Sequence, residues 1–340
     1  MRTKRTLTYD SESSGVAFKA ATFKELEAKA FERKGETVRV DLNLAKSLGL
    51  VDLDGKLTNC GLLFSDQCGL DNSNIHMRKW PGLDSGGSTI LDDKEFKGSL
   101  LYLYDRMMAF ARANTSVGYI KKYGGHDPLE SYPDRALHEA FVNALAHRDY
   151  LIDGCQIDID IYSDRMEIGV PGSFLVSGEA SSGLLRKMHS ERRNKSVCDV
   201  FTYLKMMEKS GQGFNNIVDS YKEFDPKLSP TYKALPGYFT LTLFDTMFKQ
   251  YFEPKSDVGE LAFKHLIAGN RDYDEAILEL CFDEPKRLQE LMALTKYKSH
   301  STFMSSVINP LLDAGLLIST SAKRSPTTKY ATNTDLVKKK

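Results

Sequence analysis

The chain is 340 residues long, 41% of it is hydrophobic and 27% charged, and 46 basic residues balance 46 acidic ones. This composition is ordinary for a globular protein, and no apolar run approaches the length of a membrane span, so we expect a cytoplasmic protein without a membrane partner. The five cysteines are scattered without a Cys-x-x-Cys pair, which argues against a disulfide framework or a zinc site. Because the net charge is zero, any surface for nucleic acid must be local.

The length is enough for two domains and further segments. We place an N-terminal segment at residues 1–70, a central domain at 71–248 and a C-terminal domain at 255–340. The N-terminal segment starts with a polar stretch and contains a short helical pattern at 23–33. It ends in a turn and an apolar stretch at 52–64.

The central domain interleaves two kinds of pattern. Alternation of apolar and polar residues predicts strands, and apolar residues spaced three and four apart predict helices. We therefore expect strands at 74–82, 155–162, 166–170 and 238–244, and helices at 98–114, 197–207 and 213–224 and within the stretch 132–150. An antiparallel hairpin among these elements predicts an α+β sandwich, with helices on one face of a mixed sheet. We assign Asp158 and Asp160, which alternate with isoleucines, to solvent and not to a metal.

The helix expected within 132–150 carries the residues of greatest chemical interest. Pro133 suits its first turn, because the N–H that proline lacks is not needed there. Glu139, Asn143 and His147 are spaced four apart, so they form one stripe beside the apolar face. A carboxylate can deprotonate a water, and oxygen ligands of this kind suit Mg²⁺. The simpler interpretation is an amphipathic helix with a polar flank.

Four ordered motifs add to this stripe. They are Glu139-Ala140-x-x-Asn143-Ala144-x-x-His147-Arg148-Asp149-Tyr150, Asp164-Arg165-x-Glu167-Ile168-x-x-Pro171-Gly172, Arg192-Arg193-Asn194 and Met207-Glu208-x-x-Gly211-x-Gly213-Phe214. Together they resemble the nucleotide-binding module of RecG-like and Schlafen-AlbA-associated proteins, which belongs to the gyrase, histidine-kinase and MutL (GHKL) type of ATPase. The resemblance implies a GHKL-like α/β sandwich that binds ATP or a related nucleotide with Mg²⁺.

The resemblance also implies roles for particular residues. Glu139 would act on the attacking water, Asn143 would hold Mg²⁺, and Gly211 and Gly213 would let a loop approach phosphate. The remaining residues expected at the nucleotide are His147, Arg148, Asp149, Pro171, Gly172, Arg193 and Asn194. Residues 173–190 would be either a lid over the phosphates or a plain loop.

The sequence departs from the family pattern at two positions. Val170 stands where related ATPases have an aspartate that reads the adenine amino group, and Lys195 stands where the family usually has proline. In addition, Gly-Lys-Leu-Thr-Asn-x-Gly-Leu-Leu-Phe at 55–64 resembles the joint that follows an AlbA-type domain. The chain before Asp54 is too short for that domain, so it is either absent or supplied by another polypeptide.

The C-terminal domain shows three helical patterns and a strand pair. The helices are expected at 276–282, 286–294 and 301–314, and the strands at 316–320 and 328–332. This order follows the winged helix-turn-helix plan. Residues 285–340 carry ten Lys or Arg and three acidic residues, and this basic excess favours phosphate binding. The expected DNA contacts are Lys298, Ser301, Lys323, Arg324 and Lys329. Winged helices also bind proteins, which is the alternative.

Three functions are compatible with these patterns. The first is a nucleotide-responsive, DNA-binding transcriptional regulator. The second is a slow Mg²⁺-dependent ATPase that drives a partner effector, such as a nuclease or a defence complex, and the third is a degenerate nucleotide-binding scaffold. Partners other than DNA would be a second copy of the chain, an AlbA-domain protein or an effector. The chain lacks Gly-x-x-x-x-Gly-Lys-Ser/Thr, so resemblance to RecG does not imply helicase activity.

Overall fold

The computed structural model contains two compact units, each described here by itself. Unit 1 comprises Met1–Arg78, Asp92–Ile161 and Arg165–Met247, and unit 2 comprises Lys79–Leu91, Tyr162–Asp164 and Phe248–Lys340. The residues that the structure describes are 8–83, 85, 89–115, 117–122, 125–172, 178–180, 193–208, 212–248, 252–254, 271–295, 297–320 and 328–339. Within them, no helix is both long and apolar enough to cross a membrane.

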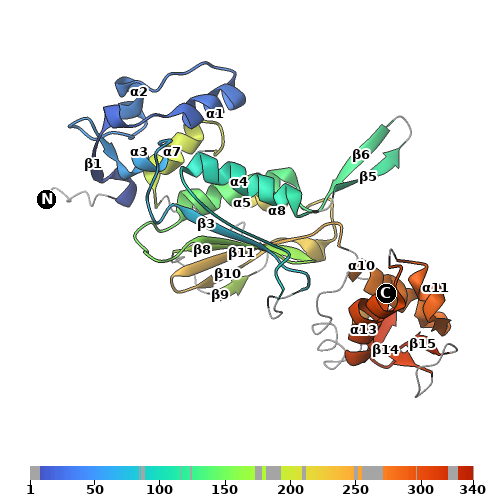
Figure 1. Cartoon of the computed structure of the whole chain (residues 1–340). Coiled ribbons are helices and arrows are strands. Elements are labelled where there is room, and N and C mark those ends of the chain that lie inside the picture. The colour runs from blue at the N-terminus through green and yellow to red at the C-terminus, as the bar shows by residue number, and fades with distance from the viewer. Residues whose placement is uncertain are drawn as a thin grey trace. The chain divides into compact units, whose positions relative to one another are not determined.

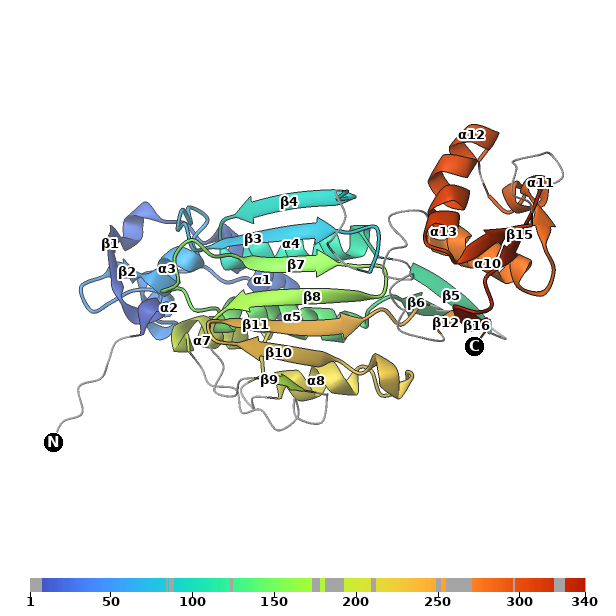
Figure 2. The same cartoon turned by 90° about the horizontal axis from the view of Figure 1, so that it is seen from below.

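The centre of unit 1 is a seven-stranded sheet in the order β4-β3-β7-β8-β11-β10-β9 (Figure 2). The strands are β3 (Asn74–Lys79), β4 (Asp92–Lys97), β7 (Ile157–Ile161), β8 (Arg165–Pro171), β9 (Gly178–Ala180), β10 (Thr231–Leu235) and β11 (Tyr238–Phe244). The pairings from β7 through β8, β11 and β10 to β9 are antiparallel. The predicted hairpin and closing strand are therefore present. β9 and β10 complete this edge of the sheet and lie outside the predicted strands.

Helices cover one face of this sheet (Figures 1 and 2). They are α4 (Leu100–Ala113), α5 (Asp134–His147) and α8 (Gly213–Asp219), and α7 (Lys195–Tyr203) packs against α5. The start of α4 is set by Ser99, whose hydroxyl accepts a hydrogen bond from the backbone N–H of Tyr102. The apolar faces of α4 and α5 are buried with the inward side chains Ile157, Ile159 and Ile161 of β7. Unit 1 is thus a mixed α+β structure, compatible with an α/β sandwich.

The N-terminal segment packs into the same unit. It consists of β1 (Ser13–Ala17), α1 (Lys24–Lys34), α2 (Leu42–Ser47), β2 (Lys56–Thr58) and α3 (Asn59–Leu63). Its buried side chains, among them Leu26, Leu57 and Phe64, belong to the same hydrophobic core as α5 and β8. A hairpin of β5 (Val117–Lys122) and β6 (Gly125–Glu130) leaves the body of the unit after α4 (Figure 1).

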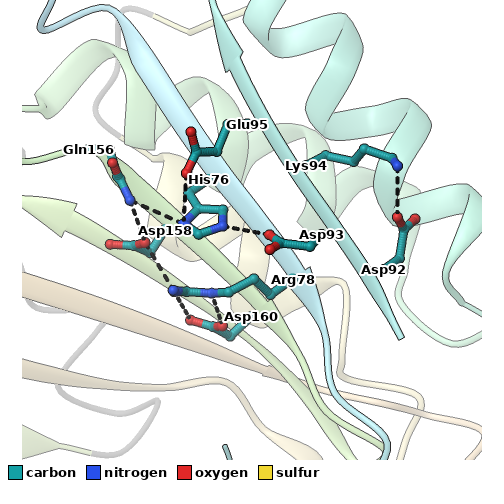
Figure 3. Close-up of polar contacts among 9 residues, drawn as sticks. All are labelled: His76, Arg78, Asp92, Asp93, Lys94, Glu95, Gln156, Asp158 and Asp160. Carbon is teal, nitrogen blue, oxygen red and sulfur yellow. Dashed lines mark hydrogen bonds and ion pairs between the residues drawn. The ribbon is translucent and has the colours of Figure 1, made fainter. Parts of the chain in front are cut away.

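The outer face of the sheet carries a polar network, shown in Figure 3. Arg78 of β3 donates to Asp160 Oδ1 at 2.8 Å and to Asp158 Oδ1 at 3.0 Å, and Tyr238 donates to Asp158 Oδ2 at 2.9 Å. The expectation that both aspartates are merely solvated is therefore wrong. Alternation along one strand correctly places them on the outer face, but it carries no information about Arg78, which is about 80 residues away.

Unit 2 contains helices around a three-stranded antiparallel sheet. In chain order the elements are α10 (Arg271–Asp283), β13 (Lys286–Arg287), α11 (Leu288–Met292), α12 (His300–Phe303), a π-helical turn (Met304–Ile308), α13 (Asn309–Asp313), β14 (Leu317–Ser319) and β15 (Lys329–Thr332). The sheet order is β13-β15-β14, and β12 (Phe252–Pro254) pairs with β16 (Val337–Lys339). The predicted helix at 286–294 is shorter than expected, because Lys286 and Arg287 pair with Tyr330 and Lys329 as a strand.

Candidate functional site

Glu139 and Asn143, two residues of the stripe on α5, lie against α8. Glu139 is buried, with 7% of its surface exposed, whereas Asn143 and His147 are half-buried. A carboxyl group at this depth is costly unless it is hydrogen-bonded. The contacts around Glu139 are therefore the starting point for the chemistry of the site.

The first turn of α8 lies directly on this stripe. A Cβ atom added to Gly213 would lie 2.7 Å from Asn143 Nδ2 and 3.2 Å from Glu139 Oε2, closer than side chains normally approach. Gly213 does not have a left-handed backbone conformation, so glycine is required here for space. Two motifs that are about 70 residues apart in sequence thus meet at the same point.

Glu139 also has a defined hydrogen-bond partner on α8. Asn216 Nδ2 donates to Glu139 Oε1 at 2.7 Å, and Arg135 Nη2 donates to Asn216 Oδ1 at 2.6 Å. Burial raises the pKa of the Glu139 carboxyl above its ordinary value, and the hydrogen bond from Asn216 opposes that rise. A carboxyl with a raised pKa is suited to taking a proton near neutral pH.

Asp149, Gly172 and Arg193 meet just beyond the end of α5. The Asp149 N–H donates to Pro171 O at 2.8 Å, and Arg193 Nη1 lies 3.9 Å from Asp149 Oδ2. Gly172 has a φ of +139°, and a Cβ there would collide with the Arg193 guanidinium. These predicted nucleotide contacts are therefore brought together. Val170 is buried in the core, and its side chain has no polar group that could hydrogen-bond to a base.

Two other predicted contacts support the backbone in this structure. Asn194 is buried, and its amide donates to Ala146 O at 2.9 Å and to Arg148 O at 2.8 Å. Arg148 is 1% exposed and donates to Asn74 Oδ1 at 3.2 Å and to the Cys155 carbonyl. Burial lowers the pKa of its guanidinium. Both residues secure the chain that leaves α5, and their contact with nucleotide stays a prediction.

The remaining predicted nucleotide residues are placed as follows. The His147 carbonyl accepts a hydrogen bond from Arg193 Nη1 at 3.3 Å, which links the end of α5 to the residue before Asn194. Gly211, Arg192 and most of the predicted lid at 173–190 lie outside the described residues.

The predicted DNA contacts that the structure describes lie on unit 2. Lys298 and Ser301 are exposed, and Ser301 follows Ser299, whose hydroxyl caps α12. Lys329 is exposed on β15 and pairs in register with Arg287 on β13, so two cations stand side by side on one sheet face. Lys323 and Arg324 lie outside the described part of the chain.

Sequence reasoning missed Arg287, Asn216 and Arg135. Arg287 was assigned to a helix, which concealed its pairing with Lys329. Asn216 stands three residues after Gly213, so helical spacing places it on the same side of α8. Arg135 precedes Glu139 by four residues and thus shares its side of α5. These two helical spacings could have identified Asn216 and Arg135 from the sequence.

Comparison with known proteins supports the predicted resemblance of the central domain to a RecG-like ATPase domain. Residues 154–243 match the family described as "Putative ATP-dependent DNA helicase recG C-terminal". This part of the chain is thus similar to a RecG-type ATPase domain, a family that suggests nucleotide binding. The match begins after α5, so it includes Pro171 and Gly213 but not Glu139 or Asn143.

A solved structure has a similar fold. It is the DIP2311 protein from Corynebacterium diphtheriae, with a TM-score of 0.59 and 18% sequence identity, and the match covers 98% of this chain. The chain spans 65% of the length of that protein. No curated protein matches the sequence. At this identity the likeness concerns the fold alone.

The residues at the α5–α8 contact fit a magnesium ion held mainly by phosphate. The described residues contain no group of three or more His, Cys, Asp or Glu side chains that could hold a metal without other ligands. Mg²⁺ takes oxygen ligands, keeps several waters and is commonly bound through substrate phosphates. The Asn143 amide oxygen borders the space that a Cβ at Gly213 would fill, so it can supply one such ligand.

Proposed function

We propose that the chain is a nucleotide-responsive, DNA-binding transcriptional regulator. Unit 1 binds ATP or a related nucleotide between α5 and α8, and unit 2 binds DNA. The observation that carries the nucleotide half is the meeting of Glu139, Asn143 and Gly213, because these residues come from separate motifs of one ATPase family. The RecG-type family match over 154–243 supports it independently of α5.

The arrangement suggests how a nucleotide would lie. Glu139 lies eight residues before His147, the last residue of α5, which corresponds to roughly 12 Å along the helix, and Asp149 lies just beyond that end. The phosphates and Mg²⁺ would lie at Asn143 and Gly213. The base would lie beside Pro171 and Gly172, where Asp149 can accept and Arg193 can donate hydrogen bonds.

The DNA half rests on unit 2. Its order of helix, strand, two further helical segments and two strands, with the sheet order β13-β15-β14, is compatible with the winged-helix plan and supports the proposal. Like charges opposite each other on a sheet are unfavourable without a counter-charge, and DNA phosphate would provide one for Arg287 and Lys329. The exposed residues Lys298 and Ser301 lie near the start of α12 and would add further contacts.

Thermal unfolding with nucleotide tests the first half. A ligand at one hundred times its Kd stabilises the folded state by about 2.7 kcal/mol. We expect ATP with Mg²⁺ to raise the melting temperature, and Asn143→Ala to abolish the Mg²⁺-dependent part of the rise. Chelation of Mg²⁺ in the parent protein is the control. No shift with any nucleotide at millimolar concentration would leave a degenerate scaffold.

The salt dependence of DNA binding tests the second half. Each phosphate-contacting cation that is removed should lower the slope of log K against log salt by about one unit. We expect this from Arg287→Ala and from Lys329→Ala. Lys227→Ala, which removes an exposed cation from unit 1, is the matched control. Equal slopes in all four proteins would remove the two residues from a DNA interface and favour a protein partner for unit 2.

The burial of Glu139 favours a second candidate, a slow Mg²⁺-dependent ATPase that drives a partner effector. A carboxyl whose pKa is raised by burial, beside the space expected for phosphate, has the properties of a general base. Phosphate release from ATP, with and without DNA, should then be measurable and should be lost in Glu139→Gln. Nucleotide binding without phosphate release would support the regulator instead.

A further inference from the structure

We infer that Asn216, itself oriented by Arg135, is the positioning residue that holds Glu139 with one carboxylate oxygen fixed and the other free to take a proton from water. The inference rests on the ATPase form of the proposed function. It adds two residues that none of the four family-like motifs contains. It also assigns different roles to the two oxygens of Glu139.

The geometry is a chain of two short hydrogen bonds. Arg135 Nη2 lies 2.6 Å from Asn216 Oδ1, and Asn216 Nδ2 lies 2.7 Å from Glu139 Oε1. Asn216 is 5% exposed and Glu139 is 7% exposed, whereas Arg135 is at the surface. The chain therefore runs from an exposed cation, through a buried amide, to a buried carboxyl group.

The chemistry of these groups determines the direction of each bond. A guanidinium can only donate, so Arg135 requires the amide oxygen of Asn216 to face it. The amide nitrogen must then face Glu139, and since it also can only donate, Oε1 must accept. A proton on Glu139 is thereby directed to the other oxygen, Oε2.

Oε2 is the oxygen on the side of Gly213, where the phosphates are proposed to bind. It lies 3.2 Å from the position of a Cβ on Gly213, and Asn143 Nδ2 lies 2.7 Å from the same position. A water beside Oε2 would thus be next to the proposed Mg²⁺ ligand. Because Asn216 anchors Oε1, the carboxyl plane cannot rotate freely and Oε2 stays directed toward Gly213.

The reaction that this arrangement serves is hydrolysis of the terminal phosphate. The water oxygen forms a bond to the γ-phosphorus, and the bond from that phosphorus to the β–γ bridging oxygen breaks. Glu139 Oε2 takes the proton that the water loses, ADP and inorganic phosphate leave, and the proton passes to solvent. Base catalysis by a positioned side chain contributes about 10²- to 10⁴-fold to such a step.

The competing explanation is that Asn216 simply ties α8 to α5. Both explanations predict a loss of stability when Asn216 is truncated, so stability does not separate them. They differ in the pKa of Glu139 and in the pH dependence of turnover. Removing the amide donor takes away the interaction that opposes the rise in the Glu139 pKa, so that pKa should rise further.

The experiment is a pH titration of the full chain, with glutamate carboxyl carbons labelled with ¹³C and the Glu139 signal assigned through Glu139→Gln. It compares the parent, Asn216→Ala and the matched control Asn215→Ala, which removes the same group from the neighbouring position on α8. Arg135→Met provides a second variant at an exposed position if Asn216→Ala does not fold. Phosphate release from ATP with Mg²⁺ is measured across the same pH range.

The inference predicts a raised Glu139 pKa in Asn216→Ala and a smaller rise in Arg135→Met. In the same proteins the pH profile of phosphate release should move upward, and kcat at neutral pH should fall by about tenfold or more with KM unchanged. Asn215→Ala should match the parent in all three readouts.

Two outcomes would overturn the inference in different ways. An unmoved Glu139 pKa in Asn216→Ala would make the contact structural, even if the parent hydrolyses ATP. A parent that releases no phosphate while the pKa responds to Asn216→Ala would instead refute the ATPase proposal, and with it the general-base role. The titration and the turnover assay therefore separate the two failures.

Discussion

At the scale of single residues, burial of Glu139 destabilises the folded protein when the carboxyl is charged, but it gives that carboxyl the raised pKa of a general base. A carboxyl buried beside space for a ligand raises the energy of its own charged form, and active sites commonly tolerate such a cost. Its pKa is raised in the folded state. Stability from this group is therefore fully present below the unfolded pKa of about 4.3 and is lost as pH rises through the folded pKa.

Glu139→Gln should therefore stabilise the protein. Glutamine retains an oxygen that can accept the hydrogen bond from Asn216 but removes the buried charge. We expect a higher free energy of unfolding than in the parent at pH 8, with the difference shrinking toward pH 5. Urea denaturation at the two pH values measures it, and a variant less stable than the parent at pH 8 would contradict the argument.

For His138, the neighbour of Glu139, we expect the opposite pH dependence of the folding stability. Its Nδ1 accepts from the Tyr104 hydroxyl at 2.7 Å and its Nε2 donates to Met206 O at 2.9 Å, so the neutral ring is satisfied on both sides. Burial first, and then the charge of Arg33, lowers the pKa of His138. The unfolded state therefore binds more protons as pH falls below about 6.5, and stability is lost there.

His138→Gln tests this assignment, because glutamine does not titrate. We expect the parent to lose more stability between pH 7.5 and pH 5 than the variant does, although the variant is less stable at pH 7.5. Denaturation curves at both pH values give the comparison. Parallel losses in the two proteins would show that other groups cause the acid sensitivity.

At the scale of elements, the contact between α5 and α8 depends on the absence of a side chain at Gly213. In Gly213→Ala the new methyl group would overlap Asn143, and overpacking of this kind costs about 1–3 kcal/mol. The higher helix propensity of alanine compared with glycine offsets at most about 1 kcal/mol of this loss. We therefore expect a net loss of stability together with weaker nucleotide binding.

Gly69→Ala is the matched control for this prediction. A Cβ there would meet nothing closer than Gln67 O at 3.9 Å, and the backbone of Gly69 is not left-handed. Thermal unfolding with and without nucleotide compares the two variants. If both behave like the parent, α8 does not press on Asn143 in solution.

The outer face of the sheet relies on Arg78 to join β3 to β7. Arg78→Met would remove the ion pairs that Arg78 makes with Asp158 and Asp160, whose side chains are 23% and 17% exposed. Loss of a partner for partly buried charges costs about 1–3 kcal/mol. Lys94→Met removes a more exposed pair with Asp92 and should change stability by no more than about 0.5 kcal/mol. Equal effects in chemical denaturation would refute the distinction.

At the scale of the whole molecule, regulation requires that nucleotide binding to unit 1 and DNA binding to unit 2 are thermodynamically coupled. If nucleotide on unit 1 changes DNA affinity by some factor, DNA must change nucleotide affinity by the same factor, and typical factors are about 5- to 150-fold. Titrating DNA with and without ATP and Mg²⁺, and then nucleotide with and without DNA, measures both. Two affinities that are each unaffected by the other ligand would make the units independent binders.

Local patterns in the sequence correctly predicted the elements that carry the site. The strand at 238–244 has the predicted bounds, and the helix predicted within 132–150 is α5, because helical and strand periodicity are encoded within a few neighbouring residues. The same spacing placed Glu139, Asn143 and His147 on one side of α5. The order of motifs in the sequence also identified a RecG-like ATPase domain, in agreement with the family match.

Contacts between distant residues were decided by the tertiary structure alone. Asn216 meets Glu139 across 77 positions of sequence, and Arg148 is buried against Asn74 across 74. Lys286 and Arg287 form a strand instead of a helix start because β15 is available to pair with them. Each of these outcomes depends on how separate elements pack together, and no local window of sequence contains both partners.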